Sequence, residues 1–354
     1  MKRIGGLWEA MLAWENLLLA YRKAKRGKRR RPDVAQFGCD LEVELLALQQ
    51  QLRDGSYQPG AYRQFTVYER KPRVISVAPF RDRVVHHAVM NVIEPPLDKR
   101  FIDDCYACRQ GKGVHKAVDR YQRYATRYAY VLKLDICRYF PSIDHAILLS
   151  HLQRRIKDPQ VLALLETIIG HSPEPDGPLD YFLGDDLLTP LERRKGLPIG
   201  NLTSQFFANL YLDDFDHWLK ETLRVPAYLR YVDDFYLLDN NKARLWDACA
   251  QIGQKLAELR LRLHPRKRQV CRTADWVDVL GYLIKPHQRR LRNDNGLRFR
   301  RKLHRLAAAY AQGRVNFSDI NPSVQSWIGH ARHADTEGLR KTLFDGVIFR
   351  RASA

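Results

Sequence analysis

The sequence predicts an α+β protein built from more than one subdomain. Runs of strand-forming residues occur in close pairs, as in antiparallel hairpins, most clearly at 227–238. Stretches whose apolar residues recur with helical spacing occupy the two ends of the chain. At 354 residues the chain is too long for one simple core and suits two or three subdomains.

Charge is the most informative feature of the composition. The chain has 60 Lys and Arg residues against 40 Asp and Glu, a formal net charge of +20. The excess recurs at several places: Arg22–Arg31, Arg193–Lys195, Arg260–Arg268 and Arg289–Arg305. This distribution predicts a polyanionic partner that lies across several surfaces. Nucleic acid fits better than a membrane, because no run of 18 apolar residues exists and no basic helix has a clean apolar face.

The first residues lack the apolar segment of a signal peptide, so we expect a cytoplasmic protein. Its six scattered cysteines should then be reduced thiols. The one close pair, Cys105 and Cys108, has no second Cys or His pair at zinc spacing. Ordinary packed thiols therefore explain this pair better than a metal or redox site.

Residues 1–60 are predicted to form a basic helical extension. Helices are expected at 7–21 and at 41–52, where apolar residues recur with helical spacing. Between them, the run 22–31 is almost entirely basic. It is either a solvated linker or a contact for a nucleic-acid backbone, and the net charge of the chain favours the contact.

The next stretch, 62–80, predicts two strands around a turn at Lys71-Pro72. Such a basic hairpin either covers an anion or protects an exposed sheet edge from aggregation. A helix follows at 81–97, and we expect Pro95-Pro96 to stop it.

A single acid at the end of a strand is the first feature that indicates chemistry. The run 130–134 predicts a strand, Asp135 ends it, and a capped helix start follows at 142–145. Active sites commonly place a metal ligand at such a strand end, although a helix-capping role is the alternative. Upstream, the loop Arg109–Gly113 resembles a phosphate cradle but lacks the full motif. Residues 171–192, rich in Pro and Asp, predict an irregular surface insertion.

Two adjacent acids, Asp233 and Asp234, lie between the strand-forming runs of the predicted hairpin at 227–238. A tight hairpin would present both at its tip, where they repel each other. A solvated turn explains the pair when it is considered alone, because Asp is a good turn former. A divalent cation is the functional alternative.

After the hairpin the chain predicts a helix at 241–261 and a strand pair at 277–284. The C-terminal stretch predicts three helices with a basic surface. They begin near 297, at Asn321-Pro322 and at Thr336-Glu337.

Asp135, Asp233 and Asp234 together suggest a catalytic site. Asp135 and Asp233 are 98 positions apart, too far for local structure to explain their meeting. Nucleotidyl transfer uses two Mg²⁺ ions about 3.5–4 Å apart, one at the attacking 3′-oxygen and one at the triphosphate. Carboxylates supply the hard oxygen ligands that Mg²⁺ prefers.

The order of these motifs resembles a reverse transcriptase of the bacterial kind. The resemblance runs from about Phe65 to Ile284, and its most specific part is the Y-x-D-D box at Tyr231–Asp234. The other matching motifs are Asp135–Phe140 (first catalytic motif), Leu263–Lys267 (lysine motif), Val279–Tyr282 (primer grip), and Arg73 with Phe80–Arg83 (fingers). The resemblance implies a right-hand polymerase: extension 1–60, fingers 61–134, antiparallel-sheet palm 135–290 with an inserted segment at about 146–200, and a three-helix thumb 291–354.

The resemblance also implies roles for individual residues. Asp135, Asp233, Asp234 and the backbone of Ile136 would bind two Mg²⁺ ions, or Mn²⁺. Lys267 would donate a proton to pyrophosphate, or else only serve as a cation at a helix end. Nucleotide or template contacts are expected from Arg73 (joined by Arg70 or Lys71), Arg81, Arg138, Tyr139, Phe140, Ile199 and Gln205. Phe140 falls at the steric-gate position that selects dNTPs, with core packing as its alternative.

Within the family, the loop with Ile199 and Ser204-Gln205 resembles the enzymes of diversity-generating retroelements, as does the Ser326–His330 stretch. Unclassified bacterial enzymes linked to phage defence resemble it too. In the first group an apolar residue at the Ile199 position accompanies error-prone copying opposite adenine. These branches imply a structured RNA, and an accessory protein or a homo-oligomer, as partners. Two other functions stay open: template-independent or protein-primed synthesis, and a non-catalytic RNA-binding protein of maturase type.

Overall fold

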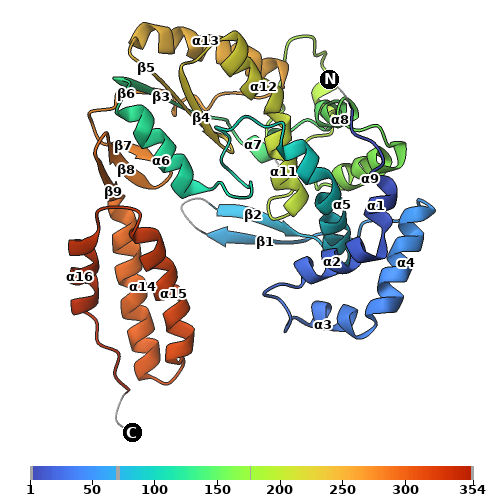
Figure 1. Ribbon diagram of the computed structural model, residues 1–354, viewed down its shortest axis with the longest axis horizontal. Helices are drawn as coiled ribbons and strands as arrows, with labels where there is room; N and C mark the ends of the chain where they lie inside the picture. Colours follow the sequence, from blue (N-terminus) through green and yellow to red (C-terminus); the bar gives the residue numbers. More distant parts are fainter. Residues whose placement is uncertain (1–2, 69–71, 176, 352–354) are drawn as a thin grey trace.

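The computed structural model describes residues 3–68, 72–175 and 177–351. Antiparallel sheets surrounded by helices give it the predicted α+β character (Figure 1). In the described part of the chain, no helix has both the length and the apolar character that crossing a bilayer requires.

The N-terminal helices pack around one long helix, α5 (Figure 1). Their bounds are α1 Trp8–Leu12, α2 Trp14–Ala24, α3 Pro32–Cys39, α4 Leu41–Arg53 and α5 Phe80–Asp98. The predicted helix at 7–21 is interrupted at Ala13, whose ψ of 136° is extended. Helix α3 was not predicted. The prediction that Pro95-Pro96 stops α5 is wrong: the helix continues to Asp98, and its last turn buries Leu97 in the core.

A two-stranded hairpin, β1 (Arg63–Tyr68) and β2 (Pro72–Val77), confirms the strands expected at 62–80. Arg70 and Lys71, the candidates to join Arg73, lie outside the described residues. The backbone N–H of Ser76 donates to the carbonyl of Ile199 at 3.0 Å, which ties β2 to the loop before α11 (Leu202–Tyr211).

The central sheet has four antiparallel strands in the order β4-β5-β3-β6. Their bounds are β3 Tyr130–Asp135, β4 Ala227–Tyr231, β5 Asp234–Asp239 and β6 Gln269–Arg272. Alternate residues of a strand point to opposite faces. On β5, Leu237 joins the large core beneath α13 (Lys242–Glu258), whereas Leu238 joins a second core with α6 (Val114–Ala125).

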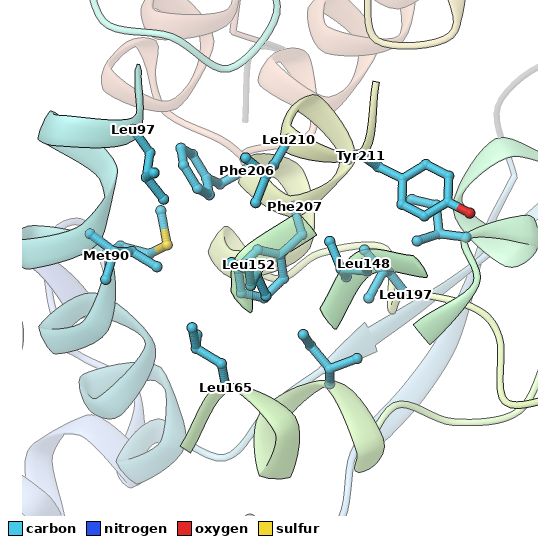
Figure 2. Close-up of a cluster of buried hydrophobic side chains, with 14 of the residues drawn as sticks. Met90, Leu97, Leu148, Leu152, Leu165, Leu197, Phe206, Phe207, Leu210 and Tyr211 are labelled. Carbon is cyan, nitrogen blue, oxygen red and sulfur yellow. The ribbon is translucent and has the colours of Figure 1, made fainter. Parts of the chain in front are cut away.

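Besides α11, the helices between β3 and β4 in the sequence are short. They are α7 Tyr139–Ser142, α8 His145–Gln153, α9 Pro159–Gly170, α10 Thr189–Glu192, α12 Asp213–His217 and the π-helix η1 Trp218–Thr222. Figure 2 shows the core that α8 and α9 share with α5 and α11, in which Met90 and Leu97 of α5 lie near Phe206 and Leu210 of α11. The irregular insertion predicted at 171–192 forms no helix or strand in its described residues up to 188, but its last four residues form α10.

The C-terminal part stands apart from the rest of the molecule (Figure 1). A three-stranded antiparallel sheet leads into it, followed by three helices: β7 Val277–Val279, β8 Tyr282–Lys285, β9 Gln288–Leu291, α14 Asn293–Ala311, α15 Phe317–Ala331 and α16 Glu337–Asp345. The predicted start of α15 at Asn321 is wrong, because a capping box between Asn316 and Asp319 starts the helix earlier. Phe299 and Trp327 stack at 4.0 Å between ring centroids and hold α14 against α15.

Candidate active site

The register of the central sheet brings the predicted catalytic acids together. Strand β3 pairs with β5 so that Asp135 lies directly opposite Asp234. Asp233 occupies the adjoining turn between β4 and β5. All three acids line one cavity of about 610 Å³, together with Lys267 and Arg73. The structure therefore gathers residues from four distant parts of the sequence at one end of the sheet.

The turn that carries the two adjacent acids is tight and strained. Tyr231 pairs with Asp234, which leaves only Val232 and Asp233 in the loop. Val232 has φ +56°, and a β-branched residue in this left-handed region costs about 1–3 kcal/mol. The carbonyl of Asp233 accepts a hydrogen bond from the backbone N–H of Ile136 at 3.3 Å. This bond joins the turn to the residue that follows Asp135.

Burial and mutual repulsion alter the acids' proton affinities. Burial, followed by the charges of Asp233 and Asp135, raises the pKa of Asp234 to about 7. The pKa of Asp233 is raised in the same way, by burial and then by Asp135. A site that concentrates negative charge at this cost suits a cationic ligand.

Lys267 neutralises part of this charge. Its ammonium group forms an ion pair with Oδ2 of Asp135. Burial lowers the pKa of Lys267, but the hydrogen bond and charge of Asp135, with Asp234 and Asp233, give a net increase. The loop before Lys267 is anchored to β3, because the N–H of His264 donates to the carbonyl of Asp135 at 2.7 Å.

The donor set fits a divalent cation in its chemistry, since carboxylate oxygens are hard ligands. Within residues 3–68, 72–175 and 177–351, however, no three His, Cys, Asp or Glu side chains are already gathered around a point that could hold an ion. Lys267 lies against one of the required oxygens. The acids are thus collected at the cavity, and the ammonium competes with any cation for Asp135.

The cavity lining also contains cationic residues that the sequence motifs did not single out. Arg292, just before α14, forms an ion pair with Asp278 of β7 at 2.8 Å. Lys133 of β3 donates to the backbone carbonyl of Asp278. Arg289–Arg305 was identified only as a basic run, and Arg292 gave no separate signal. These cations share the cavity with the acids, so a phosphate chain that entered it would meet positive charge.

Several residues predicted to contact a nucleotide lie elsewhere. Arg81 donates to Oε1 of Gln51 at 2.7 Å and lies beside Glu44, both on α4. Tyr139 is fully buried, and its hydroxyl donates to the carbonyl of Ala208. Neither is among the residues that line the cavity, because packing against α4 and α11 directs these two side chains away from it.

The other predicted contacts do not line the cavity either. Phe140 is half-buried, with its ring edge-on to Tyr139 at 5.8 Å between centroids. Arg138 adopts φ +49°, and its guanidinium occupies the space where a Cβ at Gly177 would lie. Gln205 is exposed on α11, and Ile199 is half-buried in the loop held by Ser76. Of the predicted triphosphate contacts, Arg73 alone lines the cavity among the described residues.

Residues 63–284 match the family described as reverse transcriptase (RNA-dependent DNA polymerase). The chain belongs to the reverse transcriptase family. The matched range begins with β1 and ends within β8, and it therefore includes every acid of the site. This reverse transcriptase accordingly contains an RNA-dependent DNA polymerase domain. Members of the family use an RNA template and deoxynucleoside triphosphates as substrates.

Individual relatives of this reverse transcriptase are distant. Protein YkfC of Escherichia coli K12 is 26% identical over 286 residues, covering 69% of this chain and 72% of YkfC. The group II intron-encoded protein LtrA of Lactococcus lactis is 24% identical over 239 residues. That alignment covers 65% of this chain but only 38% of LtrA. Among solved structures, telomerase of Candida albicans with a fragment of telomeric RNA aligns with a TM-score of 0.47 and 12% identity, over 83% of this chain and 56% of telomerase.

Proposed function

We propose that the protein is an RNA-directed DNA polymerase that copies a cognate structured RNA into cDNA by two-metal nucleotidyl transfer. One observation carries the proposal. Asp135 and Asp234 are cross-strand neighbours, and with Asp233 they share a cavity whose other walls carry Arg73 and Lys267. One cavity therefore contains carboxylates that can bind metal ions and cationic side chains that can bind phosphates.

Asp135, Asp233 and Asp234 would hold two Mg²⁺ ions, or Mn²⁺, with the backbone of Ile136 as a further ligand. When bound, such ions activate the attacking 3′-hydroxyl and neutralise charge on the triphosphate. Carboxylate oxygens match this demand, and the raised pKa values of Asp233 and Asp234 reflect a charge that lacks compensation.

The cationic side chains have separate roles in this proposal. Arg73, exposed on β2, binds the triphosphate. Lys267 holds a proton on Nζ, and its raised pKa keeps it charged at neutral pH, so it can donate that proton to the pyrophosphate oxygen. Phe140 selects dNTPs by excluding a ribose 2′-hydroxyl.

The subdomains of a right-hand polymerase fit the observed elements. We assign fingers to 61–134, palm to 135–290 with the segment at about 146–200, and thumb to 291–354, after the extension 1–60. Strand β3 begins at Tyr130 and pairs with β5, so the palm sheet itself starts five residues before Asp135.

For the biological setting, we propose a bacterial retroelement of the diversity-generating type or an anti-phage system. The loop with Ile199, joined to β2 through Ser76, supports this choice. A structured RNA, with an accessory protein or a second copy of the chain, would be the partner. The net charge of +20 supports an RNA that extends beyond the active site.

Incorporation of labelled dNTPs on a primed RNA template tests the polymerase. The wild type should extend the primer, and the Asp233→Asn variant should not. Asp275→Asn, in an exposed turn after β6, serves as the matched control and should extend normally. Equal synthesis without template would instead support a template-independent enzyme. Unimpaired biological function of Asp233→Asn would support the non-catalytic, maturase-like alternative.

A further inference from the structure

A buried arginine lies directly beneath the strained catalytic turn. Arg230, the fourth residue of β4, is 0% exposed. Its guanidinium forms a two-point ion pair with Asp216 of α12: Nε lies 2.8 Å from Oδ1, and Nη2 lies 2.6 Å from Oδ2. Asp216 is itself 1% exposed, so both charges are removed from water. Such a pair persists only where its geometry is well satisfied.

The surroundings fix this guanidinium completely. Nη1 donates to Oδ1 of Asn209 at 3.2 Å, and Nη2 donates to the Asn209 carbonyl at 3.3 Å. The hydroxyl of Tyr228 donates to Oδ1 of Asp216 at 2.6 Å. The backbone of Arg230 is held as well, because its N–H donates to Asp104 at 2.9 Å and its carbonyl accepts from Tyr106 at 3.0 Å.

One further contact links this network to the active site. Nη1 of Arg230 also donates to the carbonyl of Val232 at 3.1 Å. Val232 is the residue at φ +56°, so this bond fixes the orientation of the peptide that leads into Asp233. Asp233 is joined through its own carbonyl to Ile136, next to Asp135. A continuous series of contacts therefore runs from α12 to all three acids.

We propose that Arg230 is a positioning residue, which holds the Val232–Asp233 turn so that Asp233 and Asp234 present their carboxylates to the cavity. Asp216 and Asn209 act through it, by orienting its guanidinium. The inference rests on the proposed polymerase function of the same site. It adds a residue that lies beneath the turn, outside the cavity, and touches neither nucleotide nor cation.

A purely structural role makes a different prediction. Replacing a buried ion pair with apolar residues of similar volume is often neutral or stabilising. The double variant Arg230→Met with Asp216→Leu should therefore fold with nearly wild-type stability while losing the donor to Val232. If the arginine only packs the core, that variant keeps its activity. If the arginine positions the turn, the variant keeps its stability but loses activity.

The fold supplies a matched control on the same helix. Arg155 and Asp213 form a second buried ion pair at 2.8 Å, each side chain 2% exposed, and Asp213 lies on α12 three residues before Asp216. Arg155 also pairs with the exposed Asp214 at 2.5 Å. Neither residue lines the cavity or contacts the turn in the described structure. The double variant Arg155→Met with Asp213→Leu removes an equivalent pair without touching Val232.

The experiment measures thermal unfolding, the kcat and KM for dNTP addition, and Mn²⁺ binding to the protein alone by electron paramagnetic resonance. We expect the Arg230/Asp216 variant to lose about 10²-fold in kcat, the scale of a 1 Å misplacement, with little change in KM. Its Mn²⁺ affinity should fall too. Arg230→Lys keeps the charge but loses the forked pair of donors. Its kcat and Mn²⁺ affinity should lie between those of the wild type and the double variant. The Arg155/Asp213 variant should match the wild type in kcat and Mn²⁺ affinity.

Wild-type kcat and Mn²⁺ affinity in a folded Arg230/Asp216 variant would overturn the proposal, as would an equal loss in the control pair. If the double variant does not fold, Arg230→Lys decides by the same two measurements. A wild type that adds no dNTP contradicts the polymerase function instead. Mn²⁺ binding, which needs no template, then decides the positioning role by itself.

Discussion

Asp135 and Asp234 lie directly opposite each other on the antiparallel strands β3 and β5. Like charges in this position destabilise a sheet, and burial adds to the cost. The pKa of Asp234, raised to about 7, expresses both effects. The two carboxylates at the end of the central sheet therefore lower the free energy of unfolding, and this loss can be measured.

The first prediction concerns how the folding stability of the metal-free protein, kept so by EDTA, depends on pH. Because the pKa of Asp234 is raised from 3.8 to about 7 on folding, the contribution of Asp234 to wild-type stability should fall as the pH rises from about 4 to about 7 and stay low above it. Asp234→Asn has no carboxyl group to ionise at this position and should be the more stable protein at pH 8. The gain should be roughly 1.4 kcal/mol for each unit by which the pKa is raised, and it should vanish near pH 4. Urea unfolding at pH 4, 6 and 8 measures it.

The same variant should be inactive, so stability and activity change in opposite directions. Adding Mg²⁺ at pH 8 should narrow the stability difference, because a bound cation stabilises only the wild type. Asp275→Asn, at an exposed turn, controls for the loss of one negative charge. If Asp234→Asn were less stable than the wild type at pH 8 in EDTA, burial and the charges of Asp233 and Asp135 would not destabilise the ionised Asp234.

The second prediction concerns Lys267, which is ion-paired with Asp135. Lys267→Met removes a cation that competes for this carboxylate. The Mg²⁺ concentration for half-maximal synthesis should therefore decrease. The rate at saturating Mg²⁺ should fall by about 10²-fold or more, because the proton donor is gone. A Mg²⁺ titration of dNTP incorporation yields both values.

Lys255→Met is the control for that variant, since Lys255 pairs only with Glu258 among the partners described for it, on the outer face of α13. It should leave both values unchanged. An unaltered Mg²⁺ requirement in Lys267→Met would show that the ion pair does not compete with the cation. An unaltered rate at saturation would remove Lys267 as proton donor.

The sequence identified the acids of the site because their signals are local. Asp135 ends a strand, and Asp233 and Asp234 lie between two strand-forming runs, so each position follows from residues a few places away. The pairing of β3 with β5 is not local, and only the order of motifs implied it. Hairpins and helices with clear spacing were predicted for the same reason.

Side-chain direction is what the sequence did not reveal. Arg230 interrupts a strand of apolar residues. Only the packing of α12 against β4 shows that it forms an ion pair with Asp216. Tyr139 and Arg81 belong to recognisable motifs, yet α11 and α4 engage them away from the cavity. Such partners lie from 14 to 69 positions away in the sequence and leave no local pattern.

The third prediction concerns sugar selection by Phe140, whose ring is half-buried and packs edge-on against Tyr139. This contact keeps the ring from swinging away. Phe140→Val should admit a 2′-hydroxyl and increase rNTP use relative to dNTP by about 10- to 100-fold. Phe140→Tyr keeps the ring and should retain the selection. Competing incorporation of rNTPs and dNTPs measures it, and unchanged selectivity in Phe140→Val would assign the ring to the core alone.

The fourth prediction concerns copying accuracy and Ile199. The backbone of Ile199 is fixed by its hydrogen bond from Ser76, so a substitution should change the side chain without moving the loop. An apolar side chain cannot hydrogen-bond to a template base or to the incoming nucleotide, whereas glutamine can. Ile199→Gln should therefore reduce misincorporation opposite adenine, and Ile199→Val, which stays apolar, should not. Sequencing the products made on poly(rA) measures the error rate of each variant. Faithful copying of poly(rA) by the wild type would contradict the error-prone assignment, because no error would then remain for Ile199→Gln to suppress.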